Sequence, residues 1–357
     1  MAVRLDIERR LEPSLLWQSL SIVVALLASL AACALLLASA GADILAAVSA
    51  IYDGAFGSWK ATVKTLVKAS PLMLTGVAVT LAFRAKIWNI GAEGQLFAGA
   101  MMAYWAYVMC GWLPSFLLVT LIFAAGFLGG GLYGGLAGWL RSRFAVNEVL
   151  TTVMLNYIIG YFLSYMLVSG PWRDPSSFYQ QTPRIDAAAR LPPILPDSKL
   201  HLGFLIAVVM ALAAYALLKR TSLGYEIRAV GFNPLASRFK GIRVERTAIL
   251  VMVLSGGIAG LAGVSEVFGV HFRLTPEVSL GFGFTGIIVA MLAGLHPIAV
   301  VFVAILFGAL INGGIKMQIA TGVPSAMISA IEAIILLFFL AAAALNRYQF
   351  RLVSRHE

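Results

Sequence analysis

Long apolar stretches constrain this chain more than any other feature of its sequence. A helix that crosses a hydrocarbon core of about 30 Å needs about 20 mainly apolar residues. Such stretches recur along the chain, separated by charges, prolines or glycine clusters. They predict ten spanning helices, near residues 18–40, 68–84, 89–110, 114–140, 147–169, 202–218, 247–270, 280–295, 297–315 and 322–345. We therefore expect an all-α, polytopic membrane protein in which residues 1–357 form a single transmembrane domain.

The composition supports this fold class and excludes a nucleic-acid partner. The chain is 61% hydrophobic and only 12% charged, whereas about a quarter of a soluble domain is charged. The net charge is +10, but the basic residues punctuate the apolar runs instead of gathering on one face or arm. Cys33 and Cys110 lie in apolar surroundings without the spacing of a disulfide framework or a metal site.

The distribution of Lys and Arg predicts the orientation. Basic residues concentrate in loops that stay on the cytoplasmic side, and most of the 26 in this chain fall inside if both termini are cytoplasmic. This assignment makes 169–201 the longest external loop and 219–246 a cytoplasmic segment. We expect a multi-pass protein of the cytoplasmic (inner) membrane, in contact with membrane lipid.

Two glycine-rich runs predict close helix packing. Gly130 and Gly134 in one run, and Gly256 and Gly260 in the other, are spaced four apart, which lets helix backbones approach closely in lipid. A weak internal repeat relates the spans from Phe97 to those from Thr285, five spans later. An odd offset places two copies in opposite orientation, the inverted repeat of many transporters.

The segment 219–246 contains the sequence signature of a short capped helix. Asn233 suits the N-cap, Pro234 the first helical position, and Gly241 a left-handed C-terminal cap. Leu235, Ala236 and Phe239 can form an apolar face. Anchoring to anionic lipid would explain the basic residues, but a defined start, a defined stop and a phenylalanine between them favour docking of a soluble partner.

Two motifs resemble one family. GYEIRAVGFNPLASRFKGI, Gly224 to Ile242, resembles the cytoplasmic loop of ABC importer permeases for ribose and other simple sugars, branched-chain amino acids and nucleosides. FRAKIWNIGAEGQLFAGAM, Phe83 to Met101, is similar to that family's segment at the start of a pore-lining helix. Its residues are most like those of the nucleoside subgroup. The resemblance covers about residues 60 to 345 and implies the large-importer (type II-like) permease architecture.

This resemblance implies partners and a coupling role for one set of residues. The partners are an ABC ATPase subunit that binds ATP and Mg, a second permease subunit of different sequence, and an external substrate-binding protein. The solute is small and polar, expected to be a nucleoside, with a simple sugar such as a pentose as the alternative. The expected ATPase-coupling residues are Gly231, Asn233, Pro234, Leu235, Ala236, Arg238, Phe239 and Gly241.

Polar and aromatic residues inside the spans are candidates for the solute pathway. A charge at the bilayer centre costs about 2.5 to 3.5 kcal/mol on insertion scales, so Glu93, Glu266 and Glu332 require explanation. Amides can hydrogen-bond a solute and aromatic rings can stack on it, although helix packing and the lipid interface also explain them. The candidates are Trp88, Asn89, Glu93, Gln95, Asn156, Phe282, Phe284 and Asn312.

Catalysis and metal binding are not expected. A phosphate-binding loop requires a Gly-Lys pair, and the sequence has none. His201, His271, His296 and His356 lie near span ends or in the tail, without metal-ligand spacing or a partner triad. Three rivals remain: an ion-coupled secondary transporter using the buried glutamates, a passive channel and a membrane enzyme.

Overall fold

The computed structural model describes residues 3–9, 15–195, 198–324 and 326–354. Helices account for most of this part of the chain, and two strands lie near its ends. Six described helices are long and apolar enough to cross a membrane, or seven if the pair at 23–56, bent by 113°, is one span. The spanning and neighbouring helices are α1 (Leu15–Ser39), α2 (Ile44–Phe56), α3 (Trp59–Arg84), α4 (Ala92–Cys110), α5 (Ser115–Phe144), α6 (Glu148–Val168), α7 (Leu202–Arg220), α10 (Val244–Glu266), α11 (Phe282–Leu292), α12 (Pro297–Thr321) and α13 (Ala326–Arg347).

Each of the ten predicted spans overlaps a helix, but six or seven of the described helices have the length and hydropathy of a span, and α11, with 11 residues, is too short to cross by itself. Helix α2 is an additional helix that the hydropathy pattern did not predict. Short elements complete the fold. They are the helices α8 (Ser222–Phe232) and α9 (Pro234–Phe239), the single turns η1 (Ala187–Ala189), η2 (Val267–His271) and η3 (Pro276–Val278), and the strands β1 (Val3–Arg9) and β2 (Tyr348–Ser354).

The chain forms two compact units. One comprises residues 1–54 and 313–357, and the other residues 55–312. Their boundaries fall inside α2 and α12 and not in linkers, and the single domain over 1–357 remains a prediction.

The unit of residues 1–54 and 313–357 contains a pair of packed helices and a two-stranded antiparallel sheet. Helix α1 packs against α13, and buried side chains spaced four apart mark one face of α1: Ala25, Ser29, Cys33 and Leu37. Strands β1 and β2 pair antiparallel, with Val3 opposite Ser354 and Arg9 opposite Tyr348. Lys316 forms an ion pair with Asp53 at 3.4 Å.

Helices α5 and α10 of the larger unit meet at a seam of glycines. A Cβ atom built on Gly130 would lie 2.2 Å from the carbonyl oxygen of Gly256, and one on Gly256 would lie 2.3 Å from that of Gly130. A Cβ on Gly260 would meet the Gly126 carbonyl at 2.3 Å. The predicted glycine packing is confirmed, because only hydrogen atoms fit between these two backbones.

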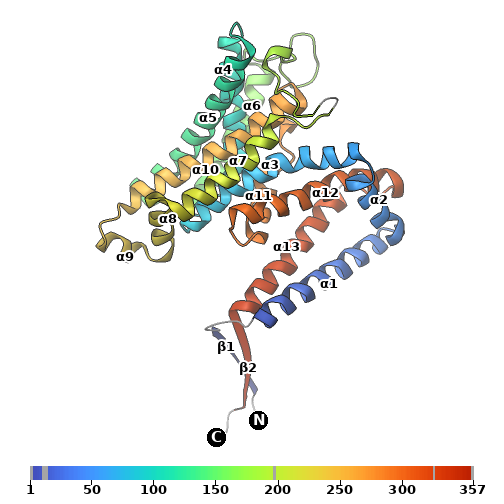
Figure 1. The fold of residues 1–357 in the computed structure, drawn as a ribbon, viewed down its shortest axis with the longest axis vertical. Coiled ribbons are helices and arrows are strands. Elements are labelled where there is room, and N and C mark those ends of the chain that lie inside the picture. The colour runs from blue at the N-terminus through green and yellow to red at the C-terminus, as the bar shows by residue number, and fades with distance from the viewer. Residues whose placement is uncertain (1–2, 10–14, 196–197, 325, 355–357) are drawn as a thin grey trace. The chain divides into compact units, whose positions relative to one another are not determined.

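The segments that connect the long helices lie at two opposite ends of this larger unit. In Figure 1, α8 and α9 lie at one end of α7 and α10, and the loop between α6 and α7 lies at the other. The backbone of this loop bonds to the segment after α10, with Leu191 N donating to Phe268 O at 3.0 Å and Thr182 N donating to Leu274 O at 3.1 Å. Over its described residues the loop contains one short helical turn, η1, and is otherwise non-helical.

Candidate coupling helix and membrane pathway

Helix α9 has the local structure that its sequence predicts. The Asn233 side chain accepts a hydrogen bond from Ala236 N at 3.1 Å, and Pro234 occupies the first turn. Gly241 follows the C-cap residue with a φ of +82°, a left-handed conformation that glycine adopts without steric cost. The helix therefore begins and ends at defined residues, although it is only one and a half turns long.

The outer face of α9 is apolar and exposed. Phe239 is 86% exposed and Leu235 is 64% exposed, while Phe232, just before the helix, is 83% exposed. Ser237 is the buried residue of this helix, and its hydroxyl donates to Asn233 O at 2.9 Å. The helix thus turns its small polar side toward the protein and presents large apolar side chains outward, which is typical of a surface that another protein covers.

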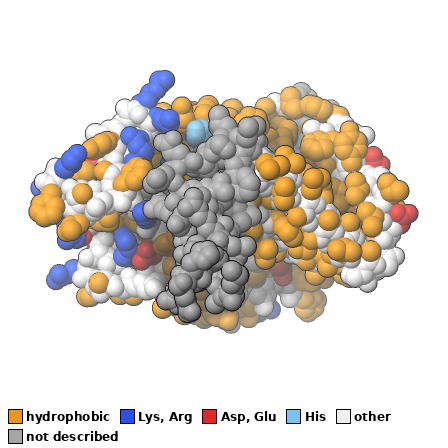
Figure 2. Space-filling view, turned by 90° about the horizontal axis from the view of Figure 1, so that it is seen from below, with side chains coloured by type: hydrophobic (Ala, Val, Ile, Leu, Met, Phe, Trp, Pro, Cys, Tyr) orange, Lys and Arg blue, Asp and Glu red, His pale blue; other side chains and the backbone are white. Residues whose placement is uncertain are grey.

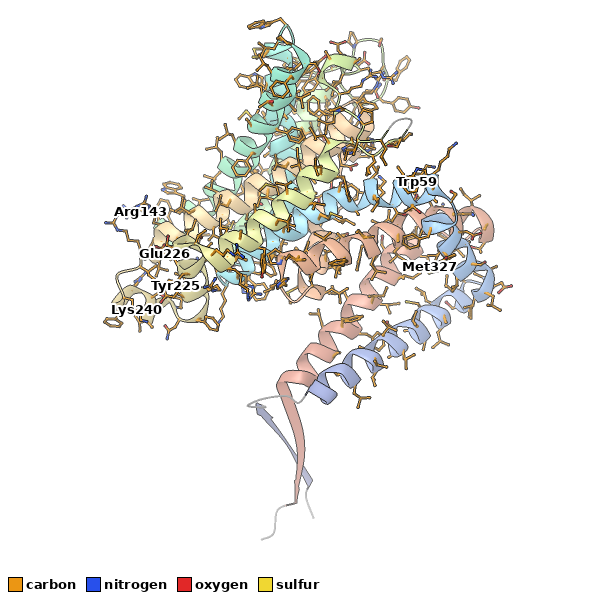
Figure 3. The ribbon with its side chains drawn as sticks, viewed as in Figure 1. Trp59, Arg143, Tyr225, Glu226, Lys240 and Met327 are labelled. Atoms are coloured by element: carbon orange, nitrogen blue, oxygen red, sulfur yellow. The ribbon has the colours of Figure 1, made fainter. Side chains whose placement is uncertain are left out.

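Ion pairs tie α9 and its neighbours together. Arg238 pairs with Glu245 in the first turn of α10, and Arg141 pairs with Glu148 across the turn between α5 and α6, at 3.2 Å. Between these elements lies a cavity of about 610 Å³, lined by Lys86, both ion pairs and Pro234, among others. Figure 3 shows Arg143, Tyr225, Glu226 and Lys240 together at this end of the unit, and Trp59 at the other end of α3.

Asn89 and Gln95, two of the pathway candidates, bond to each other in the buried interior. Each side chain donates to the other at 3.0 Å. Asn89 also donates to Ser255 Oγ at 2.9 Å and accepts from Gly91 N at 2.9 Å. Ser255 in turn donates to Ala78 O at 2.7 Å. This network joins α3 and α10 to the non-helical segment 85–91, whose polar backbone needs such partners inside a membrane protein.

Glu93 lies where the starts of two helices meet. Its carboxylate accepts from Gly283 N in the first turn of α11, at 2.6 Å, which is the favourable place for a negative charge on a helix. A Cβ on Gly283 would lie 2.2 Å from Glu93 N, so the two helix starts are in direct contact. Thr75 Oγ1 donates to Phe282 O at 3.0 Å. Thr75 lies about 14 Å along α3 from Arg84, so α11 begins deep within the bundle.

The remaining amide candidates also bond to backbone. Asn156 on α6 accepts from Gly94 N at 2.8 Å and donates to Ile90 O at 3.0 Å. Asn312 donates to Ala61 O at 3.1 Å and to Thr65 Oγ1 at 3.2 Å. These contacts hold α6 to the start of α4, and α12 to α3.

The aromatic candidates divide into one buried and two exposed rings. Phe282 is 1% exposed, with Lys68 Nζ lying 5.5 Å from its ring centre. Trp88 and Phe284 are about half exposed, and Trp88 packs edge-on against Phe83, with the ring centres 4.8 Å apart. These two rings are the pathway candidates whose surfaces remain open in the described chain.

Two further glutamates are buried. Glu266 ends α10, and its carboxylate lies 3.3 Å from His271 Nε2. Glu332 is buried in α13. No group of three or more His, Cys, Asp or Glu side chains that could hold a metal occurs in the part of the chain that the structure describes.

Comparison with known proteins identifies the family. Residues 61–343 match the family described as branched-chain amino acid transport system / permease component. The chain belongs to this permease family. The match includes α9 and the buried network around Asn89 and Glu93, so both lie within the part of the permease that defines the family.

Individual relatives of the permease extend over nearly its whole length. The guanosine ABC transporter permease protein NupP of Bacillus subtilis is 35% identical, over 91% of this chain and 93% of its own. The glucose ABC transporter permease protein TsgB13 of Haloferax volcanii is 32% identical, over 92% of this chain and 88% of its own. The nucleoside ABC transporter permease protein NupB of Lactococcus lactis is 32% identical, over 81% of each chain.

Sequence reasoning missed two features of the permease. The expected apolar face of Leu235, Ala236 and Phe239 did not include Phe232, which lies just before α9 and is nearly as exposed as Phe239. Helix α6 exposes Tyr157, Tyr161 and Tyr165, which are spaced four apart and therefore share one face. The regular spacing of these tyrosines is the signal that would have identified this face from the sequence.

Proposed function

We propose that this permease imports a nucleoside through an ATP-driven assembly in which α9 is the coupling helix. The observation that carries the proposal is the exposed apolar surface of Leu235 and Phe239 on a capped helix, with Phe232 just before it, where one ion pair, Arg238 with Glu245, joins the helix to α10. Rigid ends let such a helix transmit a displacement, because it moves as one body. ATP binding and hydrolysis by the partner subunit bias the spans between outward and inward openings.

The family and the names of the relatives support the partners that we infer. Each relative is the permease of an ABC transporter, and such a permease needs an ATPase subunit with bound ATP and Mg. We infer a second permease subunit, of different sequence, and an external binding protein. In this arrangement the α9 end is cytoplasmic, both termini lie inside, and the loop 169–201 faces outward from the cytoplasmic membrane.

The residues that we assign to coupling are those of α9 and its caps. Leu235, Phe239 and Phe232 contact the ATPase, Arg238 links the helix to α10, and Asn233, Pro234 and Gly241 fix its ends. Along the pathway we assign solute contact to Trp88 and Phe284, whose rings are open. Asn89, Glu93, Gln95, Asn156, Phe282 and Asn312 hold the helices that shape it.

The test is ATP-driven uptake by the complete transporter with Arg238→Glu and Phe239→Ala combined in this subunit. We expect uptake to fall to background while the unfolding temperature of the permease changes little, because both side chains are exposed and an exposed ion pair such as Arg238 with Glu245 contributes at most about 1 kcal/mol to stability. Normal uptake by this variant would refute the coupling assignment. Uptake without the ATPase, driven by an ion gradient, would instead favour a secondary transporter.

A simple sugar is the second candidate solute, because the similarity to the glucose permease extends over as much of this chain as the similarity to the guanosine permease does. Calorimetric titration of the partner binding protein with nucleosides and with pentoses or hexoses separates the two. Tight binding of a nucleoside supports the proposal, whereas tight binding of a sugar alone replaces it.

A further inference from the structure

Arg84 and Arg228 come from separate motifs and meet in the fold. Arg84 is the last residue of α3, and Arg228 lies inside α8. Gly231, one turn after Arg228, packs so closely on Arg84 that a Cβ would lie 2.1 Å from the Arg84 carbonyl oxygen. Residues three apart share a helix face, so Arg228 points from the same side of α8 toward the end of α3. Arg228 is therefore close enough to Arg84 for the two positive charges to repel each other.

The two guanidinium groups have few partners among the described residues. Arg84 Nε donates to Leu295 O at 2.8 Å. Arg228 Nη1 is enclosed without a hydrogen-bond partner. The ion pairs of the described chain use other basic residues. An enclosed charged donor without an acceptor is costly, and a second positive charge beside it adds to that cost.

Neighbouring groups do not neutralise both arginines. The carbonyl ends of α3 and α11 favour a cation at Arg84, but Arg228 lies in the interior of α8. The carboxylate of α8, Glu226, accepts from Thr247 at 3.1 Å. Lys219 and Arg220 at the end of α7 add positive charge. Figure 2 shows Lys and Arg side chains grouped on the side where α8 and α9 lie in Figure 1.

We propose that Arg84 and Arg228 bind a phosphate-type anion between the end of α3 and the side of α8. Planar guanidinium groups match the oxygens of a phosphate with paired hydrogen bonds. The site lies where spanning helices end, the level at which lipid headgroups meet basic pockets. The phosphodiester of an anionic lipid and inorganic phosphate share this chemistry.

Such an anion would stabilise α8, the helix that directly precedes the coupling helix α9. Helix α8 leads through Asn233 directly into α9, and an anion held by both arginines ties α8 to α3. The bound anion therefore stiffens the connection through which α9 moves the bundle, and its loss loosens that connection.

The test measures anion binding to the purified, full-length permease. Native mass spectrometry gives the affinity for phosphatidylglycerol and for phosphatidylcholine, and thermal unfolding in phosphatidylcholine nanodiscs gives the response to inorganic phosphate. Arg228→Gln should weaken anion binding about five- to tenfold. The matched control Arg220→Gln, an exposed cation at the end of α7, should change it less than about twofold, and Arg228→Lys should retain part of it.

Each outcome decides between the sources or against the site. A preference for phosphatidylglycerol that is lost in Arg228→Gln identifies a headgroup, and a phosphate response without that preference identifies the free ion. Wild-type protein that neither prefers phosphatidylglycerol nor responds to phosphate would overturn the proposal without any variant. Equal anion binding by wild type and Arg228→Gln would overturn it as well. Uptake is not measured, so an error in the proposed solute leaves this result unaffected.

Discussion

The start of α4 and the helix α9 use their polar and apolar residues in opposite ways. Around Asn89 and Glu93, polar side chains are buried and bonded to one another or to backbone. On α9, large apolar side chains are exposed and the small polar Ser237 is buried. The polar groups of the first region find partners within this chain, whereas in the proposed function the ATPase covers the second. Substitutions should therefore change stability in the first region and coupling in the second.

The largest expected effect is in the bundle interior. Gly256→Val should destabilise the fold by about 3 kcal/mol or prevent assembly, because the new side chain meets the Gly130 carbonyl with no room to move. Thermal unfolding of the detergent-solubilised protein measures the loss. Gly160→Val is the matched control, since a Cβ at Gly160 meets no atom within 4 Å; equal losses at the two glycines would contradict the packing account.

Glu93→Ala should lower the free energy of unfolding by about 2 kcal/mol, the value of a hydrogen bond to a charged group. It leaves Gly283 N without its acceptor and removes the charge at the start of α11. Chemical denaturation followed by the fluorescence of the tryptophans measures this change. If Glu93→Ala were as stable as wild type but unable to transport, Glu93 would belong to the pathway chemistry and not to the packing.

Phe239→Ala should leave stability unchanged and reduce ATP-driven uptake on the order of tenfold, the cost of losing a central contact residue at an interface. Uptake into proteoliposomes that contain the complete transporter measures the effect. Phe116→Ala removes an equally exposed ring, 80% exposed, at the start of α5, and should transport normally. A similar loss in both variants would show that exposed aromatic rings matter to the membrane and not to coupling.

The smallest effect lies in the loop between α6 and α7. Hydrogen bonds from the Ser176 hydroxyl and amide, with Arg273 nearby, hold the pKa of Asp174 below its ordinary value. Its stabilising contribution is therefore fully present above about pH 4, the ordinary carboxyl range, and is lost as pH falls through the lower pKa of the folded state. Asp174→Asn should lower the unfolding temperature slightly at neutral pH.

In acid the wild type and Asp174→Asn should converge, because protonation removes the same charge. Unfolding temperatures at neutral pH and at about pH 3 check this. Ser176→Ala should reproduce more of the effect than Arg273→Gln does, since the serine contributes most to the lowered pKa. A difference between wild type and Asp174→Asn that grows as pH falls would contradict the assignment.

Hydropathy predicted the positions of the long helices, and capping residues predicted α9, because each of these sequence features lies within a few neighbouring residues. Asn233, Pro234 and Gly241 lie where the capping rules place them. Helix α3 begins at Trp59, earlier than predicted. Lys60, Lys64 and Lys68 interrupt the hydropathy there, but their spacing of four places them on one helix face.

The partners of the polar residues could not be predicted, because they depend on contacts across the fold. Asn89 bonds to Ser255 and Glu93 bonds to Gly283, each far away in the sequence. From sequence alone, a buried amide looks the same whether it contacts a solute or a neighbouring helix. The meeting of Arg84 with Arg228 depends on the packing of α8 against α3, which neither motif encodes by itself.

Site-specific photo-crosslinking in the assembled transporter tests the coupling role of α9 most directly. A photoreactive residue in place of Phe239 should crosslink to the ATPase subunit, and the yield should change when ATP binds. The same residue in place of Trp59, which is 67% exposed at the opposite end of the bundle, should not crosslink to the ATPase. Crosslinking from position 59 but not from position 239 would contradict the account.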